Sequence, residues 1–415
     1  MNNFTPDSKI YKDFVDQLSE WGNNGTLPET CSLDLKYAFE LQSQRFKEKN
    51  VSVKYKYQIA STEDSAYARG WEDKEYSNVI NYHRFLKIRD FLVNGKRKFR
   101  EREREILYAV ITRLNNPQSV GTYCCPNCGS IHTVKVLLES GCPNCKTRFI
   151  MNDLFPKVTN YFAVKDYGEQ GTSLRSTIAL FMILGSIFGV IVSALHTMIT
   201  EPEAFRLAKT YAGFIGPAIA GLIGGYVLWA LSKFASIFKD AAKAVPKLAI
   251  QFDAKKKLPE FMLRYDPNFS YEYFIGKIIA MTRIMIFSSD YSNLAIYEGK
   301  PTTNTNTDII DVQYNGAVRL NNYSVQGPYC TLDVTVYTTN IHCKGKRIKK
   351  KNGKFRMVLC KNIMNATDYN FSVKKVQCKG CGGSFDATRD HNCPYCGNAY
   401  HLGDDDWVVL MFHKE

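Results

Sequence analysis

The chain has 415 residues, a formal net charge of +14 at pH 7 and a hydrophobic content of 45%. That apolar content excludes a globally disordered chain, and the length allows about two or three domains. The basic excess suits an anionic partner, either nucleic acid or a lipid surface, although a solvated basic surface has the same composition.

The cysteines indicate the cellular compartment. Eight of the 13 form Cys-x-x-Cys pairs, a spacing typical of metal ligands. The first residues, MNNFTPDSKIYKDF, contain neither the basic and apolar regions of a signal peptide nor an Arg-rich transit segment. We therefore expect a reducing cytosol, in which the paired thiolates hold metal and disulfides are disfavoured.

The N-terminal half reads as a short helix followed by strands. Apolar residues recur at helical spacing over residues 10–18, and residues 51–60 alternate as a strand does. The Asn-Gly dipeptide at 94–95 predicts a tight hairpin turn. Charges of alternating sign in residues 97–107 predict a salt-bridged surface.

Residues 122–150 contain two Cys-x-x-Cys turns. Each turn points two sulfurs at one position, so that two turns complete a tetrahedral four-sulfur site of the structural kind. The two-residue spacing selects Cys125 over its neighbour Cys124 as a ligand. We predict a zinc ribbon in this segment with the ligands Cys125, Cys128, Cys142 and Cys145.

Two uncharged segments, residues 178–199 and 211–231, are each long enough to form a helix across a bilayer. At ~1.5 Å per residue, each helix spans about 30 Å, the thickness of the hydrocarbon core. A pair of buried helices in a soluble protein is the alternative interpretation. We predict a transmembrane hairpin over residues 174–238.

Basic residues flank this hairpin. Lys165 and Arg175 precede it, seven lysines follow it between residues 233 and 257, and the charges of the connection 200–210 cancel. The positive-inside rule then places both termini in the cytoplasm and the protein in the cell membrane. This orientation also keeps every cysteine pair in the reducing compartment.

Both apolar segments carry two glycines four residues apart, a spacing that lets helix backbones approach closely in lipid. We expect these glycines to pack the two helices against each other, and self-association of the whole protein is the sharper alternative. The four glycines are Gly185, Gly189, Gly221 and Gly225.

The C-terminal half begins with a helix and continues as strands. Ser270 suits the N-cap, Phe269 and Phe274 are spaced as a hydrophobic staple across it, and residues 274–285 form one apolar stripe. Strand-like segments follow at residues 308–320, 328–342, 354–363 and 407–412.

The densest charge lies in residues 344–354 (KGKRIKKKNGK). It reads as a hairpin arm around Asn352 and Gly353 that either stays solvated or contacts anionic lipid or nucleic acid, and lipid is favoured because a membrane is near. The acidic segment 403–407 (GDDDW) reads as a solvated turn. The expected contact residues are Lys344, Lys346, Arg347, Lys349, Lys350, Lys351 and Lys354.

A second zinc ribbon is predicted over residues 376–400, just before the last strand. A rubredoxin-like iron site uses similar turns and is the main alternative, whereas a thioredoxin-like redox pair is normally single and lies on a βαβ unit. We predict two zinc ions per chain, and the ligands of the second are Cys378, Cys381, Cys393 and Cys396.

The C-terminal half resembles the C-terminal domain of the motor-anchor subunit of the mitochondrial inner-membrane translocase, a domain that also occurs in bacteria. The resemblance covers residues 255–412 and implies a cone-shaped α+β fold with an apolar pocket and membrane-associated scaffolding. Because a transit peptide is missing and the hairpin is additional, a bacterial relative is the better match. The residues that carry the likeness are Asp266, Pro267, Phe269, Phe274 and Trp407.

The expected fold class is α+β, with two cytoplasmic β-rich domains separated by the membrane hairpin. The N-terminal domain is placed at 1–170 and the C-terminal domain at 239–415, each with an inserted ribbon. The segments NGKRKFR (94–100) and NGKFR (352–356) each precede a strand, a ribbon and a further apolar segment. This likeness indicates that the ribbons recur because a whole module recurs.

We expect a non-enzymatic, membrane-anchored scaffold or binding protein that has an unidentified protein partner. The alternative is a membrane-tethered regulator that binds nucleic acid through the ribbons and the basic segment. A third hypothesis is an enzyme that uses the pocket of the cone, but no catalytic constellation stands out in the sequence.

Overall fold

Asn94 and Gly95 both have positive φ angles, 50° and 74°, in the computed structural model of the chain. Two such residues in succession form the tight turn whose twist matches an antiparallel hairpin. The turn joins β3 (Tyr76–Val93) to β4 (Lys96–Leu114), and the predicted hairpin is confirmed. The structure describes residues 8–59, 69–72, 76–114, 122–125, 128–146, 156–166, 174–200, 212–267, 269–292, 294–300, 302–364, 375–378, 380–381, 384–386, 389–404 and 406–415.

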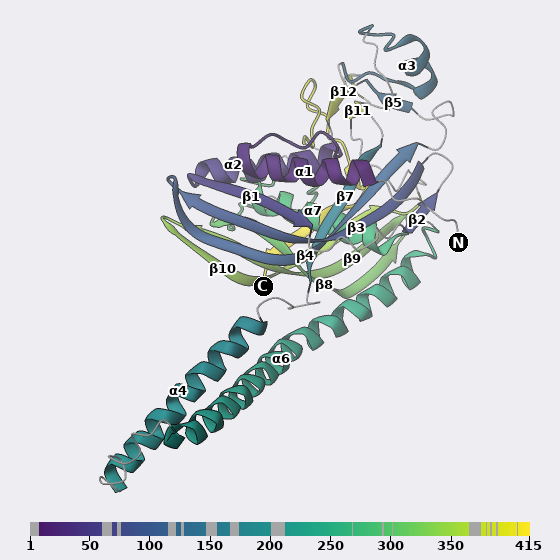
Figure 1. Ribbon diagram of the computed structural model, residues 1–415. Helices are drawn as coiled ribbons and strands as arrows, with labels where there is room; N and C mark the ends of the chain where they lie inside the picture. Colours follow the sequence, from purple (N-terminus) through teal and green to yellow (C-terminus); the bar gives the residue numbers. More distant parts are fainter. Residues whose placement is uncertain are drawn as a thin grey trace. The chain divides into compact units, whose positions relative to one another are not determined.

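The N-terminal sheet is antiparallel, with the strand order β1-β3-β4-β7 and β2 paired to β3. The expected helix at 10–18 is part of a longer helix, α1, and a second helix, α2, was not expected. Figure 1 shows α1 and α2 lying along this sheet, where their apolar side chains share a core with it. The elements are α1 (Ser8–Asn24), α2 (Leu33–Glu48), β1 (Val51–Ile59), β2 (Arg69–Glu72) and β7 (Lys157–Lys165).

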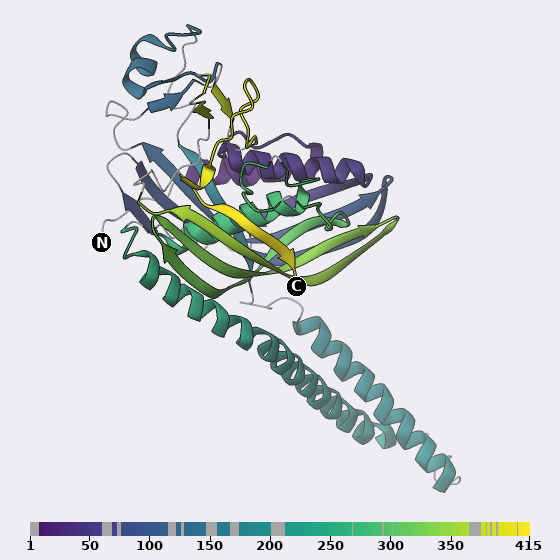
Figure 2. The same ribbon diagram turned by 180° about the vertical axis from the view of Figure 1, so that it is seen from behind.

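The C-terminal sheet is also antiparallel, with the order β13-β10-β9-β8, and Figure 2 shows β13 (yellow) at its edge. The helix before it, α7 (Tyr271–Phe287), is capped as expected, because the Ser270 side chain accepts a hydrogen bond from the Tyr273 N–H. The rings of Phe269 and Phe274 lie 5.5 Å apart across the cap. The strands are β8 (Ile309–Gln326), β9 (Tyr329–Lys344), β10 (Arg347–Asn362) and β13 (Val408–Lys414).

Each Cys-rich segment is inserted before the last strand of its sheet. The first carries β5 (Thr122–Cys124), β6 (Ile131–Thr133) and α3 (Val134–Ser140) between β4 and β7. The second carries β11 (Lys375–Gln377), β12 (Ser384–Asp386) and η2 (Leu402–Asp404) between β10 and β13. Apart from the short β2, which only the N-terminal sheet has, three strands precede the insertion in each half and one follows it.

Two further details recur in both halves. The pairing of the third strand with the last one shifts register once, between Val110 and Ile111 in β4 and between Val358 and Leu359 in β10. The last strand also forms an isolated parallel bridge to a residue that follows a helix, Cys31 to Val158 and Tyr297 to Val409. A repeated module predicts this correspondence.

The two halves, expected as separate domains, belong to one compact unit made of residues 1–166 and 250–415. Their cores are mixed. Ala38, Leu41 and Phe162 join the C-terminal core, whereas Ala280 and Ile310 join the N-terminal one. Because each half contributes apolar side chains to the core of the other, neither sheet covers its own apolar face alone.

The second unit, Tyr167–Ala249, contains the predicted hairpin. Its helices are α4 (Leu174–Thr200) and α6 (Ala212–Met262). Two segments, Ile178–His196 and Ile215–Ser232, are long and apolar enough to cross a membrane, with mean hydropathies of 2.6 and 1.6. α6 continues far beyond the expected end at 231, so the expected domain boundary at 238 lies inside a helix. The sequence after 231 is rich in Ala and Lys, which favour helix, and the helix continues through Pro246 and Pro259, residues that commonly end or kink one.

The four predicted glycines lie between α4 and α6. A Cβ atom built on Gly185 would lie 2.3 Å from the Gly221 carbonyl oxygen, and one built on Gly225 would lie 2.3 Å from the Phe181 carbonyl oxygen. Gly189 approaches the Pro217 carbonyl in the same way, at 2.5 Å. Side chains at these positions would push the helices apart, and packing of the hairpin against itself is confirmed.

Candidate metal centres

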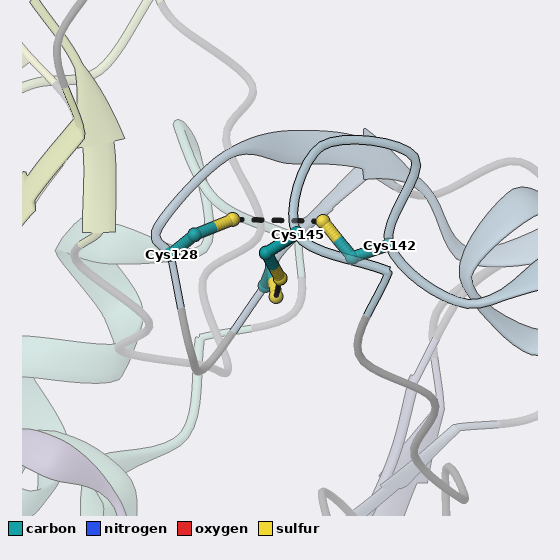
Figure 3. A group of neighbouring side chains, drawn as sticks. Cys128, Cys142 and Cys145 are labelled. Atoms are coloured by element: carbon teal, nitrogen blue, oxygen red, sulfur yellow. Dashed lines mark hydrogen bonds between the residues drawn. The ribbon is translucent and has the colours of Figure 1, made fainter.

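The first Cys-rich segment brings its four predicted ligands together. The sulfurs of Cys125, Cys128, Cys142 and Cys145 all lie within 4.8 Å of one another. Cys125 lies 3.5 Å from Cys145, and Cys128 lies 3.5 Å from Cys142, a pair that Figure 3 shows with the sulfurs pointing toward each other. Cys125, which the spacing selected over Cys124, is the residue that joins this cluster.

The backbone of each Cys-x-x-Cys turn has the shape that a metal knuckle needs. In the first turn the Gly129 N–H donates to the Cys125 carbonyl at 2.8 Å, and Gly129 has a φ of 73°. The turn that ends in Lys146 has the same bond, from the Lys146 N–H to the Cys142 carbonyl, although its φ of 60° favours glycine. The fold thus imposes this backbone shape on a lysine.

The second segment forms an equivalent cluster from Cys378, Cys381, Cys393 and Cys396, whose sulfurs also lie within 4.8 Å. Cys378 lies 3.5 Å from Cys396, and Cys381 lies 3.6 Å from Cys393. The Gly397 N–H closes the last turn on the Cys393 carbonyl at 2.8 Å. Both predicted sets of four cysteines are therefore assembled.

These distances fit a tetrahedral metal ion. With metal–sulfur bonds of ~2.3 Å, neighbouring sulfurs of a tetrahedral site are roughly 3.8 Å apart, close to the separations in both clusters. Four protein sulfurs leave no open coordination position, which is the arrangement of a structural site rather than a catalytic one. Both clusters are thus candidate metal centres of the closed type.

The surroundings of two sulfurs favour the thiolate form that binds metal. Ser130 lowers the pKa of Cys128 to about 5 through hydrogen bonds from its hydroxyl and its backbone N–H. His132, expected on the ribbon surface, lies 3.1 Å from the Ser130 hydroxyl. In the second cluster the backbone N–H groups of Cys381 and Gly380 lower the pKa of Cys378 to about 7. Sequence spacing could not reveal Ser130, because its role depends on the folded turn.

The two clusters differ in their exposure. In the first, Cys125 and Cys142 are buried around Leu137 of α3, and the other two ligands are half-buried. In the second, Cys378 and Cys393 are buried, but Cys381 and Cys396 are exposed. The remaining described cysteines lie in or near cores, as expected; they are Cys31, Cys330, Cys343 and Cys360.

The basic segment 344–354 does not form an arm around Asn352 and Gly353, and that prediction is wrong. The chain turns at Gly345 and Lys346, which lets β9 and β10 pair along their whole length. Asn352 and Gly353 lie within β10, opposite Thr339 and Thr338. Gly345 supplies the positive φ of the turn, 57°. This turn was missed in the sequence because lysines and arginines surround the glycine.

The seven expected contact residues of this segment have different surroundings. Lys350 is partly buried and pairs with Glu101 and with Glu103, at 2.7 Å from the Glu103 carboxylate. Lys344 lies 3.6 Å from Asp308, and the Lys354 ammonium lies over the Tyr337 ring. The exposed residues of the set are Lys344, Lys346, Arg347, Lys349, Lys351 and Lys354.

Lys350 belongs to a buried ionic cluster that joins the two halves. Arg89 pairs with Glu101 on β4 and, at 2.8 Å, with Asp311 on β8. Burial alone would raise the pKa of Glu101, but Arg89, Lys87 and Lys350 lower it well below its usual range. The segment 97–107, expected as a salt-bridged surface, is therefore ion-paired, but Glu101 and Glu105 lie in the interior.

A second buried charge, Lys277 of α7, was not found by sequence reasoning. Its ammonium lies 2.8 Å from Asp406 and 3.3 Å from Asp34. Burial alone would lower its pKa, but the two carboxylates raise it. Asp406 is part of the acidic segment 403–407, which is therefore more than a solvated turn.

No protein-family model matches the chain, and no curated protein matches it. The function is therefore argued from the two cysteine clusters, the apolar helices and the charge of the surface.

Proposed function

We propose that the protein is a non-enzymatic, membrane-anchored binding protein whose two cysteine clusters hold structural zinc. The observation that carries the proposal is the exposure of the apolar hairpin. None of the 178–196 segment is buried, and only 11% of the 215–232 segment is. A soluble protein rarely exposes an apolar patch of this size, whereas lipid covers one at no cost.

Zinc is the metal that these sites favour. Four thiolates in a closed tetrahedron suit zinc or iron, and zinc is the ion that structural ribbons of this spacing commonly hold. A closed zinc site contributes folding free energy directly, because the ligands meet only in the folded chain. In this proposal the two ions stabilise small rigid knobs that present a binding surface.

The orientation follows from charge. Lys165 and Arg175 lie before the apolar part of α4, and seven lysines follow that of α6, so the positive-inside rule places residues 1–166 and 250–415 in the cytoplasm. This compartment keeps thiolates reduced and available for zinc. The connection between the helices, residues 201–211, would then lie outside the cell.

The resemblance to the translocase motor anchor supports a scaffold over an enzyme. The residues that carry it occupy one cluster around the start of α7. The Trp407 ring lies 5.4 Å from the Phe274 ring, and Phe274 packs in turn on Phe269. A domain of this kind implies a protein partner held at a membrane, and that partner is part of the proposal.

Site-directed labelling tests the anchor and its orientation together. A cysteine in place of Glu203, in the connection, should react with a membrane-impermeant maleimide in intact cells. A cysteine in place of Lys351, which is exposed on β10, should react only after the membrane is opened. Labelling of both positions in intact cells, or the reverse pattern, would contradict the proposal.

A further inference from the structure

The outer face of the N-terminal sheet carries rows of basic side chains. In an antiparallel sheet, residues directly opposite each other point to the same side. The register places Lys56, Ile88 and Arg102 in one row across β1, β3 and β4. We call this surface the basic sheet face, and it comprises Lys54, Lys56, Leu86, Ile88, Asp90, Arg100, Arg102 and Arg104.

The helices cover the other side of the same strands. Val53 and Tyr55 of β1 are buried in the core that holds α1 and α2, whereas their neighbours Lys54 and Lys56 are exposed. On β4, Glu101 is buried and Arg102 is exposed. Over these rows, the alternation shows that the basic sheet face is the uncovered side of the sheet and that the other side is core, whereas Ile80 and Val110, farther along the same side, are buried.

The charge of this face is not balanced from within. Asp90 is the one acid among its eight residues, and it lies 3.6 Å from Arg100 and 3.9 Å from Arg97. Over the part of the chain that the structure describes, no ion pair is recorded for Lys56 or Arg102. The face therefore presents an excess of positive charge to a partner.

The corresponding face of the C-terminal sheet is different. There the row across β8, β9 and β10 is Arg319, Thr335 and Arg356. Arg356 is paired with Asp333 at 2.6 Å, and the Asn321 amide donates to the Thr335 hydroxyl at 2.9 Å. Polar groups of this row bond to one another, whereas Lys56 and Arg102 in the equivalent N-terminal row have no such partner among the described residues.

Aliphatic side chains lie between the lysines of β1 and the arginines of β4. Leu86 and Ile88 of β3 are half-buried, with lysines of β1 on one side and arginines of β4 on the other. Neighbouring strands are ~4.8 Å apart and β3 lies between β1 and β4, so the lysines of β1 and the arginines of β4 are about 10 Å apart. Long basic side chains beside an apolar strip are typical of surfaces that lie on anionic lipid headgroups.

We propose that the basic sheet face binds an acidic phospholipid surface. The charges are complementary, and each basic residue near an anionic leaflet strengthens binding. Nucleic acid is disfavoured because the eight residues include no aromatic side chain on which bases could stack. The inference names a partner for the membrane-anchored protein proposed above, and it does not depend on which way the hairpin crosses.

The test holds the full-length protein in nanodiscs of neutral phosphatidylcholine and adds separate vesicles. Vesicles with one acidic phosphatidylserine in three lipids are compared with pure phosphatidylcholine vesicles by co-flotation at low salt. We expect binding to the acidic vesicles only, weakened by added salt. Failure of the protein to enter nanodiscs would contradict the proposed anchor, whereas failure to bind acidic vesicles would contradict this inference.

Paired variants locate the site. The double variant Lys56→Gln, Arg102→Gln should bind acidic vesicles about 30-fold more weakly, the effect of two basic residues at an anionic surface. The control Lys9→Gln, Lys12→Gln removes the same charge from exposed positions on α1, which covers the opposite side of the sheet, and should bind as the unaltered protein does. Unchanged metal content and melting temperature show that both variants are folded.

Three results of the vesicle assay would overturn the inference. They are absence of binding to acidic vesicles, equal weakening by the control variant, and unaltered binding by the Lys56, Arg102 variant. A fluorescent RNA duplex and a single strand are titrated in the same preparation. If either binds at lower concentration than the vesicles, and through the same two residues, the partner is nucleic acid and the lipid assignment is wrong.

Discussion

The two halves of the protein share a strand order but differ in the chemistry of their sheet faces. In the C-terminal half, the inner face of β9 and β10 is apolar, with Val334, Val336 and Phe355 fully buried. In the N-terminal half, the inner face of β3 and β4 carries Arg89 and Glu101, which are also buried. The same strand order thus forms around an apolar interior and around an ionic one. Turns and the alternation of buried and exposed residues set the order of the strands, whereas the side chains of the inner face can differ.

The two ribbons differ in a parallel way. The first contains α3, whose Leu137 packs against two of its ligands. The second lacks such a helix among its described residues, and two of its sulfurs, those of Cys381 and Cys396, are exposed. Its contact with the rest of the unit includes the pair Arg389 and Glu40, at 2.6 Å. The two ribbons are therefore inserted at equivalent places in their sheets but differ in structure.

The largest expected effect separates the two ribbons. Cys125→Ser and Cys378→Ser should each remove one of the two zinc ions that we propose and unfold only the affected ribbon, because each cluster has its own small core. In zinc-finger peptides the bound zinc contributes about 10–16 kcal/mol of folding free energy. We therefore expect the affected ribbon to lose its ion and its fold completely. Elemental analysis and hydrogen exchange measure both effects.

If either substitution releases both ions, the ribbons are coupled and the comparison of two independent insertions is wrong. If the protein contains iron, the closed four-sulfur geometry stands but the zinc assignment does not. Protein prepared under reducing conditions serves as the control against loss of ligands by oxidation.

The next effect tests the ionic interior of the N-terminal half. Arg89→Met leaves Glu101 and Asp311 buried with one fewer cation, and removal of one partner from a buried pair costs about 3–5 kcal/mol. The control Arg84→Met lies on the same strand, but its side chain is 45% exposed and lies 3.6 Å from Asp166. Because Arg84 is partly exposed to solvent, whereas both partners of the Arg89 pairs are buried, loss of this pair should cost less than loss of Arg89. Denaturant unfolding of the two variants should therefore differ clearly, and equal losses would contradict the role of burial.

Acid should weaken the same cluster. The pKa of Glu101 is lower in the folded protein than its ordinary value, so the folded state binds fewer protons than the unfolded one. Its stabilisation is complete above the ordinary carboxylate pKa and is lost as the pH falls below it. The free energy of unfolding, measured from pH 7 to pH 3, should fall less steeply in Glu101→Gln than in the unaltered protein. Parallel curves would show that Glu101 is not the responsible group.

The smallest effect compares equivalent positions of the two ribbons. Lys146 and Gly397 both follow the last ligand of their cluster, with φ of 60° and 77°. A side chain in this conformation costs roughly 1–2 kcal/mol, so Lys146→Gly should stabilise the first ribbon and Gly397→Lys should destabilise the second. Resistance of each site to a chelator, followed by zinc release, should change in opposite directions. A shift in the same direction in both would contradict the equivalence of the two turns.

The sequence located local features well because each depends on neighbouring residues. The turn at Asn94 and Gly95, the cap at Ser270 and the two sets of four cysteines all follow from short spacings. The apolar segments were also clear, since length and absence of charge are properties of the chain itself. The turn at Gly345 was missed because lysines and arginines surround it and a second candidate turn, Asn352 and Gly353, lies in the same basic segment.

Only the tertiary structure decided which residues from distant segments meet. Glu101, on β4, lies against Lys350, on β10, and nothing in either segment indicates the other. The mixed cores likewise join halves that the sequence separates by a long apolar segment. Local periodicity fixes which side of a strand is apolar, but the partner that covers it is chosen by packing between surfaces far apart in the chain. This packing partly buries the basic segment 344–354, whereas the lysines of β1 and Arg100 and Arg102 of β4 stay exposed.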